Sequence, residues 1–343
     1  MLRKTELKLT YPISLLLSTS KRKTCESISS IANLSGDSFC RILQQPIITM
    51  TDLVQIAKNI FTNRKLYLVI DDTIISKIYS QSIEGSCDNY NSSSGQTYRS
   101  LCSVAAVLTD GRNAIPIGQE LWISKKFSPD NYQRKWEIAQ NLITQIQPLL
   151  SMHMVVADGL YANVGMMKEC LDKGILFEMR FHSNRVIEYH GQKISIKELD
   201  CLKLKKRRKA RTKKGIWQGM TLFFTAVKKI TKSDRVIITY QVSNYKAAAQ
   251  VHVRNYSYRW CIEKFFRTAK QHLGLNDCQA RSKVAQKNHI MNVFFAYALL
   301  QIEKIKKNLK NPEEALRRLK KKKFENLKSY FSRSTQIFEV VYA

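Results

Sequence analysis

Four side chains that can bind a phosphate or a metal ion lie at helical spacing in the stretch YSYRWCIEKFFRTAKQHLGL, residues 256–275. They are Tyr256, Arg259, Glu263 and Lys270. At about 100° per residue, a single helix would place all four within a stripe about 60° wide. A carboxylate flanked by a phenol and two cations can hold a metal ion beside a bound phosphate. The same spacing also arises in a helix with ordinary ion pairs between turns.

The remaining face of this helix is expected to lie in the core. An apolar stripe follows the charged one, formed by Ile262, Phe265, Phe266, Ala269 and Leu273. Trp260, beside the charged stripe, is expected to pack as well. The helix would therefore bury one face and present the adjacent face to a substrate.

Further acids stand where two apolar runs end. Asp71 and Asp72 follow LYLVI, and Asp158 follows MVVA. Carboxylates at the carboxyl ends of neighbouring strands line the crevice where open α/β sheets bind ligands. Together with Glu263, such acids can hold two Mg²⁺ ions about 4 Å apart. Adjacent strand residues point to opposite faces, so one of Asp71 and Asp72 is expected to be a ligand, and the residue types leave open which.

The elements that would position these acids follow from periodicity and turn signals. Strand, acid and helix follow one another over residues 152–174, which predicts an α/β protein with a mixed sheet covered by helices. Residues 100–124 predict a hairpin turning at Asp110-Gly111, and residues 131–147 predict a helix. A loop is expected at residues 85–100, which are rich in Ser, Asn and Gly.

The N-terminal 60 residues predict a separate helical segment. Within it, SISSIANLSGDSFCRIL has the rhythm of a helix-turn-helix, with Asp37 or Ser38 as the cap of the second helix. Any small helical hairpin would give the same pattern. The two alternatives for this segment are therefore a DNA-reading motif and an ordinary helical hairpin.

Short β-rich runs fill residues 175–245 and enclose the basic run KLKKRRKARTKK, residues 203–214. The run contains Lys205, Lys206, Arg207 and Arg208. Such a segment is either a solvated loop or a phosphate clamp. The overall charge of the chain favours the clamp.

That charge is large for 343 residues. Lys and Arg number 57 and Asp and Glu 27, for a net charge of +30. This favours a nucleic-acid partner over a merely basic soluble surface. The eight cysteines form no CxxC pair, which argues against a zinc site and a disulfide framework and is typical of a reduced, cytoplasmic protein. No apolar run reaches about 18 residues, so no membrane span is expected.

The motifs DDTIISK, VVADGLYAN and Y-x2-R-x3-E-x6-K resemble those of a DDE transposase of the insertion-sequence-four group, over residues 64–300. The resemblance implies a ribonuclease-H-like core with a mostly β insertion. It implies that Asp72, Asp158 and Glu263 are the catalytic residues and ligands of two Mg²⁺ ions, with Mn²⁺ as the alternative ion. Asp72 is chosen because it directly precedes the threonine of the first motif.

The resemblance also implies partners. Tyr256, Arg259 and Lys270 would contact DNA phosphates beside the scissile bond, and we add Arg267 on the same helix as a DNA contact. Such an enzyme binds terminal inverted repeats in double-stranded DNA, cleaves them and transfers the 3′-OH end to target DNA. Relatives act as homodimers in a synaptic complex.

The expected organisation has five parts. They are a helical segment at 1–60, the first part of the catalytic core at 61–174, a β-rich insertion at 175–250, a helical completion of the core at 251–310, and a basic, peripheral tail at 311–343. Two other functions stay open: a non-catalytic DNA-binding protein derived from a transposase, and a ribonuclease-H-like nuclease of repair or recombination. The presence of all three acids favours the transposase.

Overall fold

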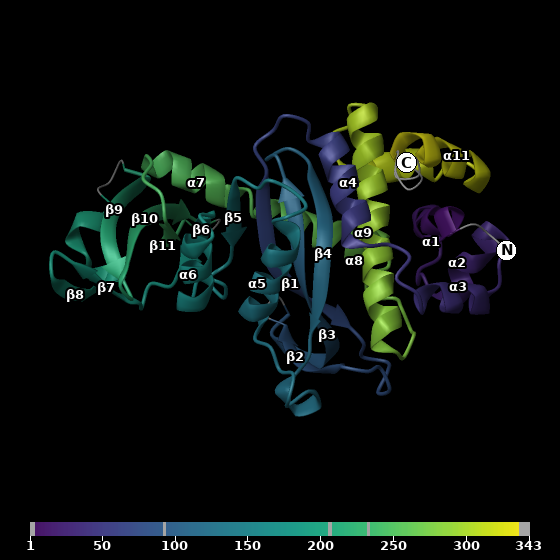
Figure 1. Cartoon of the computed structure of the whole chain (residues 1–343), viewed down its shortest axis with the longest axis horizontal. Helices are drawn as coiled ribbons and strands as arrows, with labels where there is room; N and C mark the ends of the chain where they lie inside the picture. The colour runs from purple at the N-terminus through teal and green to yellow at the C-terminus, as the bar shows by residue number, and fades with distance from the viewer. Residues whose placement is uncertain (1–3, 92–93, 205–207, 232–233, 336–343) are drawn as a thin grey trace.

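A mixed β-sheet forms the centre of the molecule (Figure 1). The computed structural model describes residues 4–91, 94–204, 208–231 and 234–335. Five strands of the central sheet lie in the order β4-β3-β1-β5-β6. They are β1 (Tyr67–Ser76), β3 (Gln96–Thr109), β4 (Ala114–Trp122), β5 (Met154–Ala157) and β6 (Leu176–Phe181). Strands β1, β5 and β6 are parallel, whereas β3 and β4 are antiparallel to their neighbours.

The second half of the sheet is built from the short β runs that follow. Strand β11 (Val236–Ser243) pairs with β6, and β10 (Met220–Ile230) and β9 (Ala210–Trp217) continue the sheet. Strands β7 (Val186–Tyr189) and β8 (Gln192–Ser195) complete it, before the short 3₁₀ turns Ile196–Glu198 and Asp200–Leu202. The predicted β content of this region is confirmed. Of the basic run, Lys205, Lys206 and Arg207 lie outside the described residues, and Arg208 is exposed.

Helices cover the central strands on both faces. They are α4 (Met50–Ile60), α5 (Lys135–Ile146), α6 (Val164–Asp172), α8 (Trp260–His272) and α9 (Lys283–Lys306). The predicted helix in 131–147 is confirmed as α5, because Ile138, Leu142 and Ile146 recur at helical spacing and are buried. The predicted hairpin is confirmed as β3 and β4, with Gly111 at φ +89° in its turn. Within the described part of the chain, no helix is long and apolar enough to cross a membrane.

The expected loop at 85–100 is largely a hairpin. Strand β2 (Cys87–Asn91) pairs with the first residues of β3, from Gln96 to Ser100. The prediction was wrong because side-chain bonds favour the strands here. Asn89 Nδ2 donates to the Ser100 carbonyl at 3.2 Å and to Ser100 Oγ at 3.0 Å, so a polar sequence still pairs.

The two ends of the chain meet on the side of α9 that faces away from the sheet (Figure 1). The N-terminal helices are α1 (Lys4–Leu17), α2 (Cys25–Ser29), the 3₁₀ turn Ser30–Ala32 and α3 (Gly36–Leu43). Helices α10 (Pro312–Leu319) and α11 (Phe324–Thr335) pack beside them. The segment expected to be a peripheral tail therefore contributes to the core, since Leu316, Leu319 and Phe331 are buried.

The predicted helix-turn-helix rhythm is present, but its capping differs. Ser35 caps α3, and its side chain accepts a hydrogen bond from the Ser38 amide at 3.2 Å. Asp37 lies in the first turn, so neither Asp37 nor Ser38 is the cap. The turn itself is made by Asn33 at φ 52°, because asparagine tolerates the left-handed region. DNA reading by these helices stays a prediction.

His289 joins the N-terminal helices to the core. Its Nε2 donates to the Gly274 carbonyl at 2.9 Å, since a carbonyl can only accept. Its Nδ1 therefore accepts from the hydroxyl of Tyr11, on α1, at 3.0 Å. The ring is fully buried, and burial lowers the pKa of His289 to about 3. The bond from Tyr11 requires the neutral imidazole, because a protonated ring has a donor at both nitrogens and cannot accept at Nδ1.

This arrangement predicts an acid-sensitive junction. Between about pH 6 and pH 3 the unfolded chain binds a proton at His289 that the folded chain does not, so stability falls as pH falls. We expect wild type to lose about 1.4 kcal/mol per pH unit more than His289→Gln in this range. The glutamine amide keeps a donor and an acceptor but does not titrate. Urea unfolding at several pH values measures the difference, and parallel curves for the two proteins would contradict it.

Candidate active site

Asp71 and Asp158 are neighbours where the parallel pairing of β1 with β5 ends. The expectation that the first strand ends at its two aspartates is wrong, because β1 continues to Ser76 through its pairing with β3. Strands β1 and β5 run in register up to the pair Ile70 and Ala157, so the next residue on each is an aspartate. Burial is the main cause that raises the pKa of Asp71 to about 7, and the charges of Asp72 and Asp158 add to it. Only Arg259 among the nearby charged side chains of the described residues lowers it. The site therefore concentrates negative charge where water does not fully solvate it.

A tightened junction sets the position of Arg259. The single helix expected to carry Tyr256, Arg259, Glu263 and Lys270 is instead two helices, α7 (Ala249–Ser257) and α8. Between them the amides of Tyr258, Arg259, Cys261 and Ile262 bond three residues back rather than four. This 3₁₀ geometry brings residues three apart above one another. As a result, the Arg259 guanidinium lies 5.8 Å from the centre of the Tyr256 ring.

Arg259 bridges two of the predicted acids. Its Nη1 donates to Asp71 Oδ2 at 2.9 Å, and its Nη2 forms an ion pair with Glu263 Oε1. Burial lowers the pKa of Arg259, but Tyr256 and these carboxylates together raise it above its ordinary value. Its Nε is buried and has no acceptor among the described residues. The guanidinium thus holds α8 to β1 and keeps one donor unused.

The face of α8 that packs on the core is the predicted one. All five residues of the apolar stripe are buried. The Phe265 ring packs edge-on against two rings of α9, with centre-to-centre distances of 5.0 Å to Phe294 and 4.8 Å to Tyr297. This packing fixes the rotation of α8 and so directs Glu263 toward β1.

Asp72 points to the opposite face of the sheet. Its Oδ2 accepts from Lys135 Nζ, on α5, at 2.7 Å, and its Oδ1 accepts from the Tyr161 hydroxyl at 3.1 Å. The thiol of Cys102 lies 3.5 Å from Oδ2. The structure therefore does not bring Asp72 together with Arg259 and Glu263, because adjacent residues of a strand face opposite ways.

Lys135 and Tyr161 are the site neighbours that the sequence did not single out. Tyr161 carried a signal, since it ends the motif segment DGLY that follows the second strand. Lys135 carried none, because its helix lies far along the chain from Asp72 and reads as an ordinary amphipathic helix.

A close packing contact forms the turn after Asp158. A Cβ atom at Gly159 would lie 2.8 Å from Nε2 of His182, so only glycine fits without a shift. The Asp158 carbonyl accepts from the Tyr161 amide at 3.1 Å. This turn directs the chain away from the sheet directly after the acid.

The other two predicted DNA contacts on α8, Lys270 and Arg267, lie in different surroundings. Lys270 is partly buried, and burial lowers its pKa. Arg267 is exposed and lines a separate cavity with Lys264 and Trp260. The expectation that Trp260 packs is wrong, since 56% of its surface is exposed.

The chemistry of the donors suits a hard divalent cation. Asp71, Asp158 and Glu263 offer carboxylate oxygens, the ligands that Mg²⁺ prefers. Burial, with the charges of Asp72 and Asp158, raises the pKa of Asp71, and a bound cation would oppose this effect. Nevertheless, no three Asp, Glu, His or Cys side chains of the described residues are grouped closely enough to hold a metal ion. Arg259 currently occupies the space between Asp71 and Glu263.

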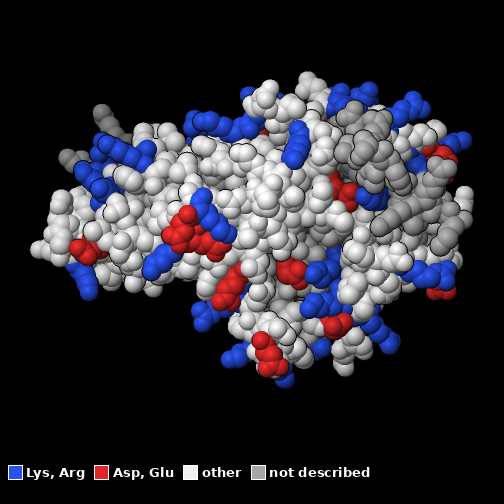
Figure 2. Space-filling view, viewed as in Figure 1, with Lys and Arg blue, Asp and Glu red and all other residues white. Residues whose placement is uncertain are grey.

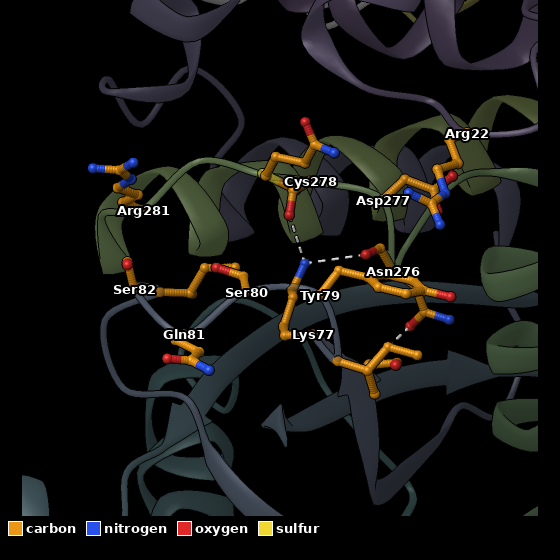
Figure 3. A pocket seen from close by; sticks show the side chains of 14 residues that line it. Arg22, Lys77, Tyr79, Ser80, Gln81, Ser82, Asn276, Asp277, Cys278 and Arg281 are labelled. Atoms are coloured by element: carbon orange, nitrogen blue, oxygen red, sulfur yellow. Dashed lines mark hydrogen bonds between the residues drawn. The ribbon is translucent and has the colours of Figure 1, made fainter. Parts of the chain in front are cut away.

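The far end of α8 meets the end of β1 at another cavity, of about 490 Å³ (Figure 3). The Ser76 amide donates to Asn276 Oδ1 at 3.3 Å. Lys77 Nζ donates to the carbonyls of Asn276 at 3.2 Å and Cys278 at 2.7 Å, and its burial lowers its pKa to about 8. Lys77 therefore fastens the loop after α8 to β1, so that strand and helix are tied at both ends.

Basic side chains dominate parts of the surface (Figure 2). On the face shown, Lys and Arg gather along the upper edge, over the strands near β9, over α7 and over the C-terminal helices. Asp and Glu lie mainly in the middle and lower parts of the same face. This uneven distribution is suited to a polyanion.

These features define an α/β protein with a carboxylate site where the parallel pairing of two neighbouring strands ends. The sequence model of the family described as "Transposase DDE domain" matches residues 65–299, which is more than half of the chain. The chain belongs to this family. Its function is that of a transposase, whose family acts on DNA and generally uses divalent metal ions. No curated protein matches the chain.

The role of Arg259 predicts a measurable change at Asp71. Arg259→Gln removes the nearby charge that lowers the pKa of the Asp71 carboxyl, so we expect that pKa to rise clearly above 7 in the metal-free protein. Carbon-detected NMR titration of the side-chain carboxyl measures it. Lys135→Gln is the matched control, since Lys135 pairs with Asp72 on the other face. An equal shift in both variants would contradict the assignment.

Proposed function

We propose that this protein is the transposase of an insertion sequence and that Asp71, Asp158 and Glu263 are its catalytic acids. The bridge from Asp71 through Arg259 to Glu263, with Asp158 next along the sheet, is the observation that carries this proposal. The enzyme would bind terminal inverted repeats, cleave the strand by hydrolysis and transfer the 3′-OH end to target DNA.

Asp71 takes the role that the motif comparison gave to Asp72. Asp71 shares its face of the sheet with Asp158 and α8, whereas Asp72 is held by Lys135 and Tyr161 on the other face. A first acid on the wrong side of β1 could not reach the same metal ion as Glu263. Asp72 would instead act through its position, by fixing β1 to α5 through Lys135.

The three acids would together hold divalent ions, Mg²⁺ or Mn²⁺. When bound, two such ions would activate the attacking oxygen and stabilise the leaving oxygen of the phosphodiester. Arg259 would then give up its carboxylate partners and turn toward a DNA phosphate, for which its unpaired Nε is already a donor. The Tyr256 ring lies along the guanidinium and would guide that movement.

Several finer features belong to the same proposal. The order β4-β3-β1-β5-β6, with only the last three strands parallel, supports a ribonuclease-H-like core. Membership of the insertion-sequence-four group, DNA contacts by Lys270, Arg267 and the 203–214 run, a homodimer in a synaptic complex and a cytoplasmic location are proposed from the sequence motifs and composition.

Glu263→Gln tests the metal-dependent reaction. The amide keeps the size and one oxygen of the side chain but loses its charge, so we expect DNA binding to remain and Mg²⁺-dependent strand cleavage to fall by more than about 100-fold. A supercoiled-plasmid nicking assay measures cleavage, and fluorescence anisotropy measures binding. Cleavage at the wild-type rate would exclude Glu263 as a metal ligand.

Paired variants of the first motif separate its two acids. Asp71→Asn should reduce cleavage by more than about 100-fold, whereas Asp72→Asn should lower it by about 10 to 100-fold at most, the range for residues that support a metal site from outside. The same nicking assay, with circular dichroism to confirm folding, compares them. The reverse order of the two effects would restore Asp72 as the ligand.

A further inference from the structure

A strongly basic cavity lies beside α8, at the opposite end of that helix from the cavity of Figure 3. Its volume is about 390 Å³. Its walls come from the β3–β4 turn, from α8 and from the segment that joins α9 to α10. The cations that line it are Arg112, Lys264, Arg267, Lys304 and Lys310.

Little negative charge balances these cations. The lining contains one carboxylate, Glu313, which accepts a hydrogen bond from the Thr268 hydroxyl at 2.5 Å. Among the described residues, no carboxylate pairs with the side chains of Arg112, Lys264, Arg267 or Lys310. Five like charges around one small space repel one another, and an anion in that space would remove the repulsion.

Lys304 is less exposed than the other cations of this group. Lys304 Nζ donates to Asn113 Oδ1 at 2.9 Å and is partly buried. Burial is the main cause that lowers its pKa; the charge of Asp110 acts against this shift, and the charge of Lys264 adds to it. The positive charge in the cavity of Figure 3 is better balanced. There Lys77 Nζ donates to backbone carbonyls, and Asp277 lines the wall.

The cavity and the candidate active site share helix α8. Trp260, Lys264 and Arg267 occupy successive turns of α8, and Glu263 is the residue before Lys264. From Trp260 to Arg267 the helix rises about 10 Å, close to three nucleotide steps of a DNA strand at about 3.4 Å each. The exposed Trp260 ring borders the cavity on the side of Arg259, whose guanidinium lies 6.0 Å from the ring centre.

We propose that this cavity binds the phosphodiester backbone of DNA, over about three nucleotides next to the reacting phosphate. Arg, Lys, Thr and Gln side chains supply the usual contacts to DNA phosphates, and each is present in the lining. The inference rests on the proposed function for its DNA partner. It adds a second DNA contact, separate from the acids. This contact is formed by Lys264, by Arg112 in the β3–β4 turn, and by Lys304 and Lys310 on and after α9.

The salt dependence of DNA binding tests the proposal without any need for cleavage. Lys264→Gln/Arg267→Gln removes two exposed charges, so the slope of log affinity against log salt for a 40-base-pair duplex should fall by about 1.8. Arg22→Gln/Arg281→Gln is the matched control, since it removes two exposed charges at the cavity of Figure 3. Its slope should stay at the wild-type value. Measurement in EDTA keeps the result independent of metal-dependent chemistry.

An unchanged slope in the Lys264/Arg267 variant, or an equal fall in both variants, would overturn the proposal. Inorganic phosphate added at constant ionic strength tests for a small-anion site, and loss of the difference between the variants in millimolar phosphate would assign the cavity to free anions. Absence of DNA binding by wild type would instead refute the proposed function, whereas failure of the slope change alone would leave the catalytic assignment intact.

Discussion

The repulsion between carboxylates held close together is the constraint around which the site is organised. Strands β1 and β5 bring Asp71 and Asp158 side by side, and α8 adds Glu263. Burial makes the negative charge costly, as the raised pKa of Asp71 shows. One guanidinium, that of Arg259, offsets part of this cost by bridging Asp71 and Glu263. The same excess of negative charge that destabilises the protein alone would favour a divalent cation.

Hydrophobic packing gives this charged arrangement its rigidity. Phe265 is set against the aromatic rings of α9, and Lys77 ties the loop after α8 to β1. The 3₁₀ junction before α8 then places Arg259 at the first turn of the helix. Because α8 is fixed to β1 at both ends, Glu263 has little freedom relative to the acids of the sheet. Movement at the site would thus fall mainly on the Arg259 side chain.

Positive charge surrounds the acids without neutralising them. The cations near the site are divided between carboxylate partners, as for Arg259 and Lys135, and cavity walls that lack such partners, as for Lys264 and Arg267. The first group organises the protein, whereas the second is available to a polyanion. A chain of net charge +30 can therefore contain an acidic site and still present a basic surface suited to a polyanion.

The sequence by itself determined the α/β class, the β-rich region and the buried face of α8, because periodicity and turn residues act locally. It also singled out Glu263 and Arg259, whose spacing of four is visible in any helix. Only the tertiary structure decided which of Asp71 and Asp72 faces them, since that depends on which helix covers each face of β1. The cap at Ser35, the hairpin at β2 and the split between α7 and α8 likewise depended on side-chain hydrogen bonds and packing between distant segments, which local patterns do not encode.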